Sequence, residues 1–316
     1  MMRAKLVNEV REILSKSGFY LSKKEYQKIM PFDMIARKDD WLLIICVSMN
    51  ADSSRMKNAE EMKILNDALD TSPLYIAIKG GQRKLKRGVV YSRKGIPLMS
   101  PETFHDMMLE GVPPYVFSAP GGFYVKMDSD LLQTARKKRQ LSLSKLAEIA
   151  GVSRKAIQKY EEGMGADLDV ALKLQEFLGE DLILPINPFQ QEEYKEEYEI
   201  SIKRYSDFER VIFESLISIG YNVKPTSNCP FEALTEDENE VLLSGIGEVD
   251  DDKMKKKAKI VSNLSDIIEK ESVIFLHTTS KKMNIEGIPV IKKNELSKVD
   301  DKKQVSELIT ERSDKS

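Results

Sequence analysis

The stretch SLSKLAEIAGVSRKAIQKYEEG (residues 142–163) contains two short helical patterns separated by a glycine and a serine. Gly151 can adopt the left-handed backbone conformation that ends a helix, and Ser153 is placed to cap the next helix. Ala147 is small enough to let two helices approach closely. The pattern predicts a helix-turn-helix with helices near residues 143–150 and 154–161. The residues expected where the helices meet are Leu146, Val152, Ile157 and Tyr160.

The outward face of the second helix follows from its inward face. If Ile157 and Tyr160 point inward, then Arg154, Lys155 and Gln158 share the opposite side. Arg and Lys read guanine in the major groove and Gln reads adenine, and such helices touch base edges near their N-terminal ends. We therefore expect Arg154, Lys155 and Gln158 to contact bases of double-stranded DNA.

Positive charge surrounds this motif, since residues 131–163 hold eight Lys or Arg against three acidic residues. Such an excess attracts the phosphate backbone. The expected phosphate contacts are Ser144, Lys145, Ser153, Lys159, Arg136, Lys137, Lys138 and Arg139. Two alternatives remain open: a helical hairpin that only resembles the motif, or a true motif that binds protein.

The segment 128–185 resembles the Cro/phage-repressor family of helix-turn-helix domains through LAEIAGVS, KYEEG and the following DVALKLQEFLG. In that family an arginine of the first helix pairs with the glutamate after the recognition-helix aromatic. The resemblance implies a structural ion pair between Arg136 and Glu161. Leu143 departs from the pattern, because many members carry a polar, phosphate-contacting residue there.

The two outer segments resemble each other. Residues 31–78 align without a gap to residues 230–277, so that PFD (31–33) falls on PFE (230–232). Upstream, ILSKSGFY (13–20) matches SLISIGYN (215–222), and downstream GIPLMSPETF (95–104) matches GIPVIKKNEL (287–296). Continuous apolar strands alternate with helices in each copy, which indicates a small α/β sheet covered on both faces. Two unrelated α/β segments with a common pattern are the alternative.

The predicted fold class is α/β (α+β), with two duplicated α/β domains flanking an all-α helix-turn-helix domain. The expected boundaries are a first copy at 1–111, a Pro/Gly linker at 112–127, the helix-turn-helix domain at 128–186, an acidic linker at 187–204, a second, acidic copy at 205–300 and a polar tail at 301–316.

The composition limits the function classes. No apolar run approaches the length that spans a bilayer, and the N-terminus reads as an amphipathic helix, so we expect a cytoplasmic protein without a membrane partner. Two cysteines and two histidines, none at metal-ligand spacing, predict no metal and no cofactor. Residues 1–111 carry 19 basic and 14 acidic residues, and residues 188–316 carry 20 and 27, so nucleic acid is expected toward the N-terminal side.

The outer copies also resemble the core of the PD-(D/E)xK nuclease superfamily, in which an Asp and a following Glu-x-Lys hold Mg²⁺ and support the attacking water. Asp33 and Glu232 match the first position. The Glu-x-Lys positions hold Cys46-Val47-Ser48 and Gly245-Ile246-Gly247 instead. We therefore expect nuclease-like folds without catalytic residues, and Asp33 reads as a carboxylate at a strand start.

Two basic stretches lie outside the motif. Residues 79–94 carry seven Lys or Arg and no acid, which fits either a hairpin that reaches flanking phosphates or a solvated hairpin. The run KMKKKAK (253–259) reads as a solvated helical face.

The whole arrangement resembles a family of archaeal HTH-type transcriptional regulators. We predict a sequence-specific DNA-binding transcriptional regulator that is a homodimer and has no enzymatic activity. The alternatives are a metal-dependent nuclease targeted by the helix-turn-helix and an adaptor that contacts the transcription machinery.

Overall fold

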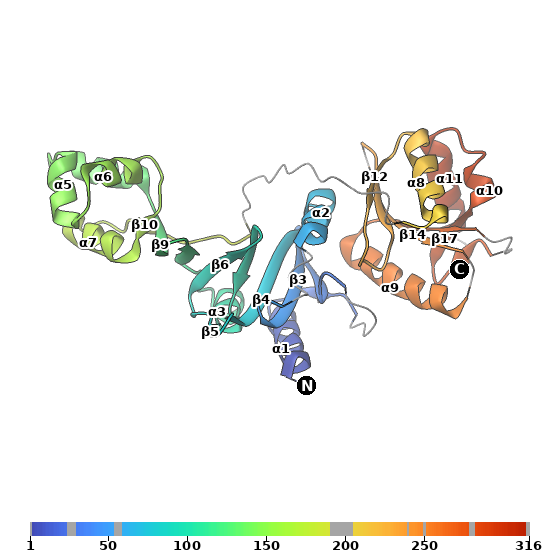
Figure 1. Cartoon of the computed structure of the whole chain (residues 1–316), viewed down its shortest axis with the longest axis horizontal. Helices are drawn as coiled ribbons and strands as arrows, with labels where there is room; N and C mark the ends of the chain where they lie inside the picture. Colours follow the sequence, from blue (N-terminus) through green and yellow to red (C-terminus); the bar gives the residue numbers. More distant parts are fainter. Residues whose placement is uncertain are drawn as a thin grey trace. The chain divides into compact units, whose positions relative to one another are not determined.

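A computed structural model describes residues 2–23, 30–53, 59–189, 205–238, 240–248, 251–277 and 282–313. The chain divides into two compact units. One comprises residues 1–17, 47–53 and 74–191, and the other comprises residues 18–46, 54–73 and 192–316. The division passes through the N-terminal α/β domain, which therefore contributes to both units. Figure 1 labels the elements.

The N-terminal domain is a mixed sheet with the strand order β1-β2-β3-β4-β7-β6, and β5 pairs with β4. The central part of β3 is buried along its length, as the apolar run WLLIICVSM predicted. Its elements are α1 Met2–Lys16, β1 Tyr20–Leu21, β2 Met34–Lys38, β3 Trp41–Asn50, α2 Ala59–Leu69, β4 Ser72–Gly80, β5 Arg83–Lys84, β6 Val89–Arg93, β7 Ile96–Met99 and α3 Pro101–Leu109.

The C-terminal domain has a six-stranded sheet with the order β12-β13-β14-β15-β17-β16. Its core includes Phe213, Leu216 and Phe275. Its elements are α8 Asp207–Ile219, β12 Asn222–Pro225, β13 Ala233–Glu236, β14 Val241–Gly247, α9 Asp252–Ile268, β15 Ser272–Leu276, β16 Asn284–Ile285, β17 Ile288–Lys292, α10 Lys293–Leu296 and α11 Lys302–Ser313.

The strand registers of the two α/β domains coincide residue by residue. Met34 lies opposite Ile45 in the first sheet, and Ala233 lies opposite Ser244 in the second. The alignment of residues 31–78 with residues 230–277 places Met34 on Ala233 and Ile45 on Ser244, so the two pairs are equivalent. Three further pairings correspond in the same way: Tyr20↔Arg37 with Asn222↔Glu236, Tyr75↔Leu98 with Ile274↔Val290, and Arg93↔Ile96 with Ile285↔Ile288. Because a one-residue slip would reverse every side chain, this agreement supports a duplicated domain.

The segment expected to be a Pro/Gly linker, 112–127, instead forms a β-hairpin of β8 Val116–Ala119 and β9 Gly122–Met127. β8 runs parallel to β6 and so extends the first sheet. Gly121 has a φ of 102° in the turn between the strands. The Pro-Gly signal therefore marks a hairpin turn, and the aromatic residues beside it belong to strands.

The helical domain follows this hairpin in the same unit. Its helices are α4 Ser129–Lys138, α5 Leu143–Ala150, α6 Arg154–Glu161 and α7 Leu168–Leu178. Two short strands, β10 Ala166–Asp167 and β11 Ile183–Leu184, pair with β9, so the domain is helical but not all-α. Figure 1 shows β9 and β10 beside α7, on the side of the helical domain away from α5.

The C-terminal segment also differs from the expected polar tail. Residues 302–313 form α11, whose Val305 and Ile309 are buried in the second core. Their spacing of four residues places both on one helical face. Of the expected acidic linker at 187–204, residues 190–204 lie outside the described part of the chain.

Candidate nucleic-acid interface

The helix-turn-helix has the caps and bounds that the sequence predicted. Gly151 ends α5 with a φ of 73°, in the left-handed region. The Ser153 side chain accepts a hydrogen bond from the backbone N–H of Ala156 at 3.1 Å and caps α6. Ser142 caps α5 in the same way through the N–H of Lys145. The turn between the two helices is therefore fixed by local hydrogen bonds.

The two helices meet through apolar residues. Leu146, Ile157 and Tyr160 are buried, and Val152 packs partly against the same core. Ala147 is 4% exposed, which fits its expected role as a small contact residue. Because Ile157 and Tyr160 face this core, the remaining surface of α6 faces away from it.

The ion pair implied by the family resemblance is present. The Arg136 guanidinium donates to Glu161 through Nε–Oε1 at 2.6 Å and Nη2–Oε2 at 2.8 Å, and Nη1 donates to the Leu141 carbonyl at 3.0 Å. The two side chains are 12% and 6% exposed. The hydrogen bonds to Glu161 raise the pKa of Arg136 above its ordinary value. The pair joins α4 to the end of α6.

This geometry corrects one expected phosphate contact. Arg136 is largely buried, and all three of its donor nitrogens are engaged within the domain. A guanidinium held in this way is not available to a phosphate. Arg136 therefore belongs to the support of α6 and not to the DNA-facing surface.

The three expected base-contacting side chains lie exposed on α6. The neighbouring Lys159 is exposed as well. Gln158 donates from Nε2 to Glu162 Oε1 at 2.9 Å. The sequence pattern did not indicate this contact, which links the Gln158 side chain to the C-cap residue of α6.

The remaining expected phosphate contacts are exposed, but several have partners. Lys145 pairs with Glu148 at 3.0 Å on the surface of α5, and Lys137 donates to Gln133 at 2.7 Å. Arg139 donates to the Leu178 carbonyl at 2.8 Å. Its guanidinium also lies 5.4 Å from the centre of the Phe177 ring. Ser144 and Lys138 are exposed.

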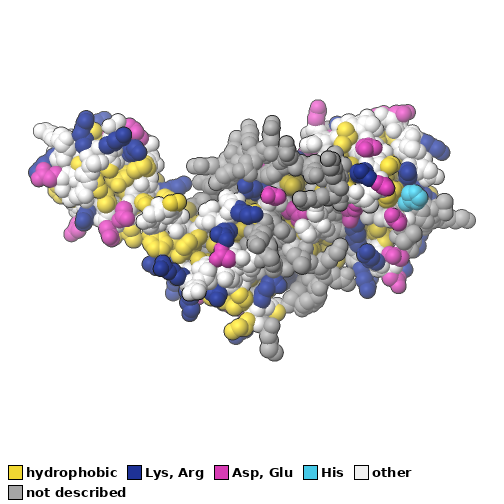
Figure 2. All heavy atoms as spheres, in the orientation of Figure 1, with side chains coloured by type: hydrophobic (Ala, Val, Ile, Leu, Met, Phe, Trp, Pro, Cys, Tyr) yellow, Lys and Arg dark blue, Asp and Glu magenta, His cyan; other side chains and the backbone are white. Residues whose placement is uncertain are grey.

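The space-filling view places positive charge on the same helices. In Figure 2, Lys and Arg side chains gather on the side of the helical domain where Figure 1 places α5 and α6. Acidic side chains interrupt this surface. The arrangement can attract a polyanion while offering a few fixed polar groups for discrimination.

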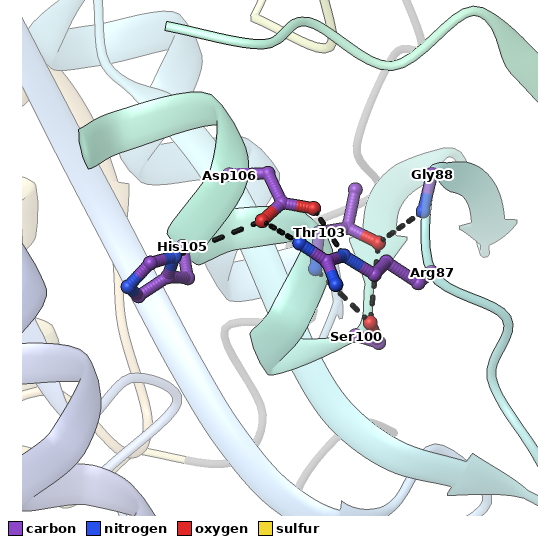
Figure 3. A network of polar contacts seen from close by, with 6 residues as sticks. All are labelled: Arg87, Gly88, Ser100, Thr103, His105 and Asp106. Carbon is purple, nitrogen blue, oxygen red and sulfur yellow. Dashed lines mark hydrogen bonds and ion pairs between the residues drawn. The ribbon is translucent and has the colours of Figure 1, made fainter. Parts of the chain in front are cut away.

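The basic stretch 79–94 lies on the first sheet, and part of its charge is neutralised within that domain. Arg87 donates to both carboxylate oxygens of Asp106 on α3, at 2.5 and 2.6 Å, and this pairing lowers the pKa of Asp106. Gly88 N–H donates to Thr103 Oγ1 at 2.9 Å in the same network (Figure 3). Arg93 pairs with Asp52. The stretch still fits either a hairpin that reaches flanking phosphates or a solvated hairpin. Two of its seven basic side chains, Arg87 and Arg93, are paired within the domain.

The nuclease position of the second copy holds an ion pair that the sequence analysis missed. Glu232 pairs with Lys257 of α9 and accepts a hydrogen bond from the Ile246 N–H at 2.6 Å. Lys257 also donates to the Ile246 carbonyl at 3.0 Å. Burial raises the pKa of Glu232, and the attraction of Lys257 offsets this only in part. Lys257 is thus largely buried, which corrects its assignment to a solvated helical face.

The residues around this position do not fit a divalent metal. An ammonium group already contacts the first carboxylate. A Cβ atom at Gly247, where the motif has its lysine, would lie 1.9 Å from the Met254 side chain. In the first copy Cys46 and Ser48 stand at the motif's Glu and Lys positions and are buried. Among the described residues, no group of three His, Cys, Asp or Glu side chains could hold a metal.

No helix in the described ranges is both long and apolar enough to cross a membrane.

Comparison with known proteins defines the class of this protein. Residues 3–114 match the PD-(D/E)XK superfamily domain, and residues 132–184 match a helix-turn-helix domain. The chain is therefore a helix-turn-helix protein with an N-terminal domain of the nuclease superfamily, in agreement with the predicted fold class.

Three similar proteins match along their whole length. A "Putative HTH-type transcriptional regulatory protein" of Archaeoglobus fulgidus is 36% identical, with 99% of each chain covered. Relatives with the same description in Methanosarcina barkeri and Haloquadratum walsbyi are 35% and 34% identical and cover 99% and 100% of this chain, and 98% and 99% of their own. The chain belongs to this family of archaeal HTH-type transcriptional regulatory proteins.

Proposed function

We propose that this protein regulates transcription by binding double-stranded DNA in a sequence-specific manner through α6. The observation that carries the proposal is the exposed face of Arg154, Lys155 and Gln158 on a helix whose N-terminus is capped and whose inner face is fixed by Ile157 and Tyr160. A rigidly held helix can present these side chains to base edges at a reproducible angle.

The surrounding side chains have different proposed roles. Ser144, Lys145, Ser153, Lys159 and the exposed basic residues at the end of α4 supply contacts to phosphate, which position the helix without reading sequence. Arg136 and Glu161 hold α6 against α4. Glu162 orients the Gln158 amide through their hydrogen bond.

We also propose that two chains bind together. The described part of each chain contains one helix-turn-helix, and proteins of this kind commonly bind two half-sites about one helical turn apart as dimers. Contact with the transcription machinery and a location in the cytoplasm stay predictions.

Neither α/β domain cleaves DNA in this proposal. The second nuclease position is closed by Lys257 and Met254, and the first lacks the second carboxylate and the lysine. Cleavage of DNA by the purified protein with Mg²⁺ or Mn²⁺, abolished by Asp33→Ala, would favour the nuclease alternative instead.

The proposal is tested by binding titrations on a bound sequence identified by genome-wide mapping and on scrambled DNA, at several salt concentrations. Arg154→Ala or Gln158→Ala should cost about 1–3 kcal/mol on the bound sequence and relax specificity at one or two base pairs. Lys159→Ala should weaken both DNAs alike and reduce the salt slope by about one. Lys173→Ala on the exposed side of α7 is the matched control. Equal losses on both DNAs for Arg154→Ala and Gln158→Ala would refute the assignment of α6.

A further inference from the structure

One of the two compact units contains residues from both α/β domains. The contact centres on Glu61 in α2 of the first domain, which is only 9% exposed. Its Oε1 accepts hydrogen bonds from the backbone N–H groups of Ser227 and Asn228 at 2.8 and 3.0 Å, and from Asn228 Nδ2 at 3.2 Å. Three donors converge on Oε1, whereas Oε2 is buried without a hydrogen-bond partner in the described part of the chain, so the cost of removing this carboxylate from water is compensated at one oxygen only.

A second set of contacts joins the same two domains. α9 packs against β2. The Lys23 N–H donates to Asn263 Oδ1 at 2.5 Å. Arg37 donates to the Ile268 carbonyl at 3.1 Å, and it pairs with Glu269 at 2.6 Å. The three partners in the second domain, Asn263, Ile268 and Glu269, lie along α9 and at its C-cap.

The two sets of contacts are reciprocal. α2 and α9 occupy equivalent positions in the two copies. α2 contacts the segment between β12 and β13, and α9 contacts the equivalent segment between β1 and β2. Each copy therefore presents the same two elements to the other, as the subunits of a twofold dimer do.

The charges at this contact differ between the copies, and they disfavour a pairing of two second copies but not one of two first copies, in which Arg37 would meet Asp70. The sequence alignment places Arg37 opposite Glu236 and Glu269 opposite Asp70. Two second copies that met in this arrangement would bring Glu236 toward Glu269, and like charges disfavour that pairing. Within one chain Arg37 meets Glu269, and Glu236 pairs with Lys224 of its own sheet at 2.8 Å.

We propose that the two α/β domains of one chain pair with each other through this pseudo-twofold surface, with Glu61 as its anchor and Arg37–Glu269 as a second contact. The loop that Glu61 holds leads directly into residues 230–232, which contain the nuclease-position Glu232. This proposal does not depend on the DNA-binding role of α6.

The anchor is tested by amide hydrogen exchange on the full chain. In Glu61→Ala, the backbone amides of Ser227 and Asn228 should exchange about tenfold faster or more, since they lose their acceptor. Glu60→Ala is the matched control, because Glu60 is the exposed neighbour in the same helical turn. Unchanged exchange at 227 and 228 in a folded Glu61→Ala protein, or an equal acceleration in Glu60→Ala, would overturn the proposal. Should Glu61→Ala fail to fold, Glu61→Gln answers the same question with a smaller expected acceleration.

The contact between Arg37 and Glu269 is tested by charge reversal. Arg37→Glu and Glu269→Arg should each accelerate exchange at the Lys23 amide, which donates to Asn263 of α9, the helix that ends at the reversed pair. The double variant restores opposite charges and should return exchange toward the wild-type rate. If the double variant shows the sum of the two single effects, the charges do not meet and the proposed pairing is wrong.

Discussion

The central helical domain and the second α/β domain each contain a largely buried ion pair between two of their elements, and the two pairs are built differently. Arg136 and Glu161 share two parallel hydrogen bonds, and the pKa of Arg136 is raised. In the other pair a single oxygen of Glu232 accepts from both Lys257 and Ile246, and burial raises the pKa of Glu232. Interaction with the partner outweighs desolvation for Arg136, whereas desolvation outweighs the interaction for Glu232.

The difference shows how each domain responds to losing a partner. A guanidinium without its carboxylate stays charged at any ordinary pH. A buried carboxylate without its ammonium can take up a proton and become neutral. The stability lost on removing one partner should therefore be independent of pH in the central domain and strongly dependent on pH in the second α/β domain.

The largest expected effect is at the central pair. Glu161→Ala leaves Arg136 buried and charged, and should reduce the local unfolding free energy of α4 and α6 by about 3–5 kcal/mol. Amide exchange between pH 5 and pH 8 should show a constant loss. Glu162→Ala, at the exposed neighbouring position, is the control and should change little. Equal stability of Glu161→Ala and the wild type would show that the pair does not hold α6.

A smaller, pH-dependent effect is expected at Lys257. Lys257→Met should destabilise the second α/β domain by about 2–3 kcal/mol at neutral pH, which is less than at the better buried central pair. The loss should shrink as the pH falls, because protonation of Glu232 removes the unpaired charge. Lys256→Met, at an exposed position on the same helix, is the control. A loss that stays the same down to pH 5 would contradict the comparison.

The third prediction concerns the pH slope of the wild-type second domain. Because the pKa of Glu232 is raised on folding, the folded state binds the proton more tightly than the unfolded state. The contribution of Glu232 to the free energy of unfolding is therefore fully present at low pH. It is lost as the pH rises from about 4.3 through the raised pKa, by at most about 1.4 kcal/mol per pH unit. Glu232→Gln should remove this slope.

The control for that slope lies in the first α/β domain. The Arg87 guanidinium lowers the pKa of Asp106, so the contribution of Asp106 has the opposite sign and disappears as the pH falls. Asp106→Asn should therefore leave the slope of the second domain unchanged. A wild-type slope that persists in Glu232→Gln would assign it to another group.

The smallest expected effect is at the exposed pair of α5. Lys145 and Glu148 are more than half exposed, so Lys145→Ala should change stability by less than about 0.5 kcal/mol. Thermal unfolding of the variant measures this value. A loss comparable to that of Glu161→Ala would mean that burial does not distinguish the pairs.

Features set by short-range chemistry were predictable from the sequence. The bounds of α5 and α6 follow from a glycine, a serine and apolar spacing within about twenty residues. The strand register of the second sheet could also be inferred from that of the first. The alignment of the two copies assigns each strand residue of one sheet to an equivalent residue of the other.

Features set by contacts between distant residues were not predictable. Lys257 meets Glu232 across 25 residues, and Glu61 meets Asn228 across 167. Neither residue is unusual in its own sequence surroundings. The β8–β9 hairpin was missed for a different reason, because its proline and glycines also fit a linker when strand pairing with β6 is unknown.

The pairing of β9 with β11 bears on how the helical domain could be replaced during evolution. Asp128 N–H donates to the Leu182 carbonyl at 2.8 Å, so the chain enters and leaves the helical domain at the same place. Segments whose ends lie together are the ones that host chains most readily accept as insertions. Residues 128–182 thus have the end geometry of an insertable segment, and a replacement placed between β9 and β11 would have to supply its own partner for the edge of β9 that β10 now occupies.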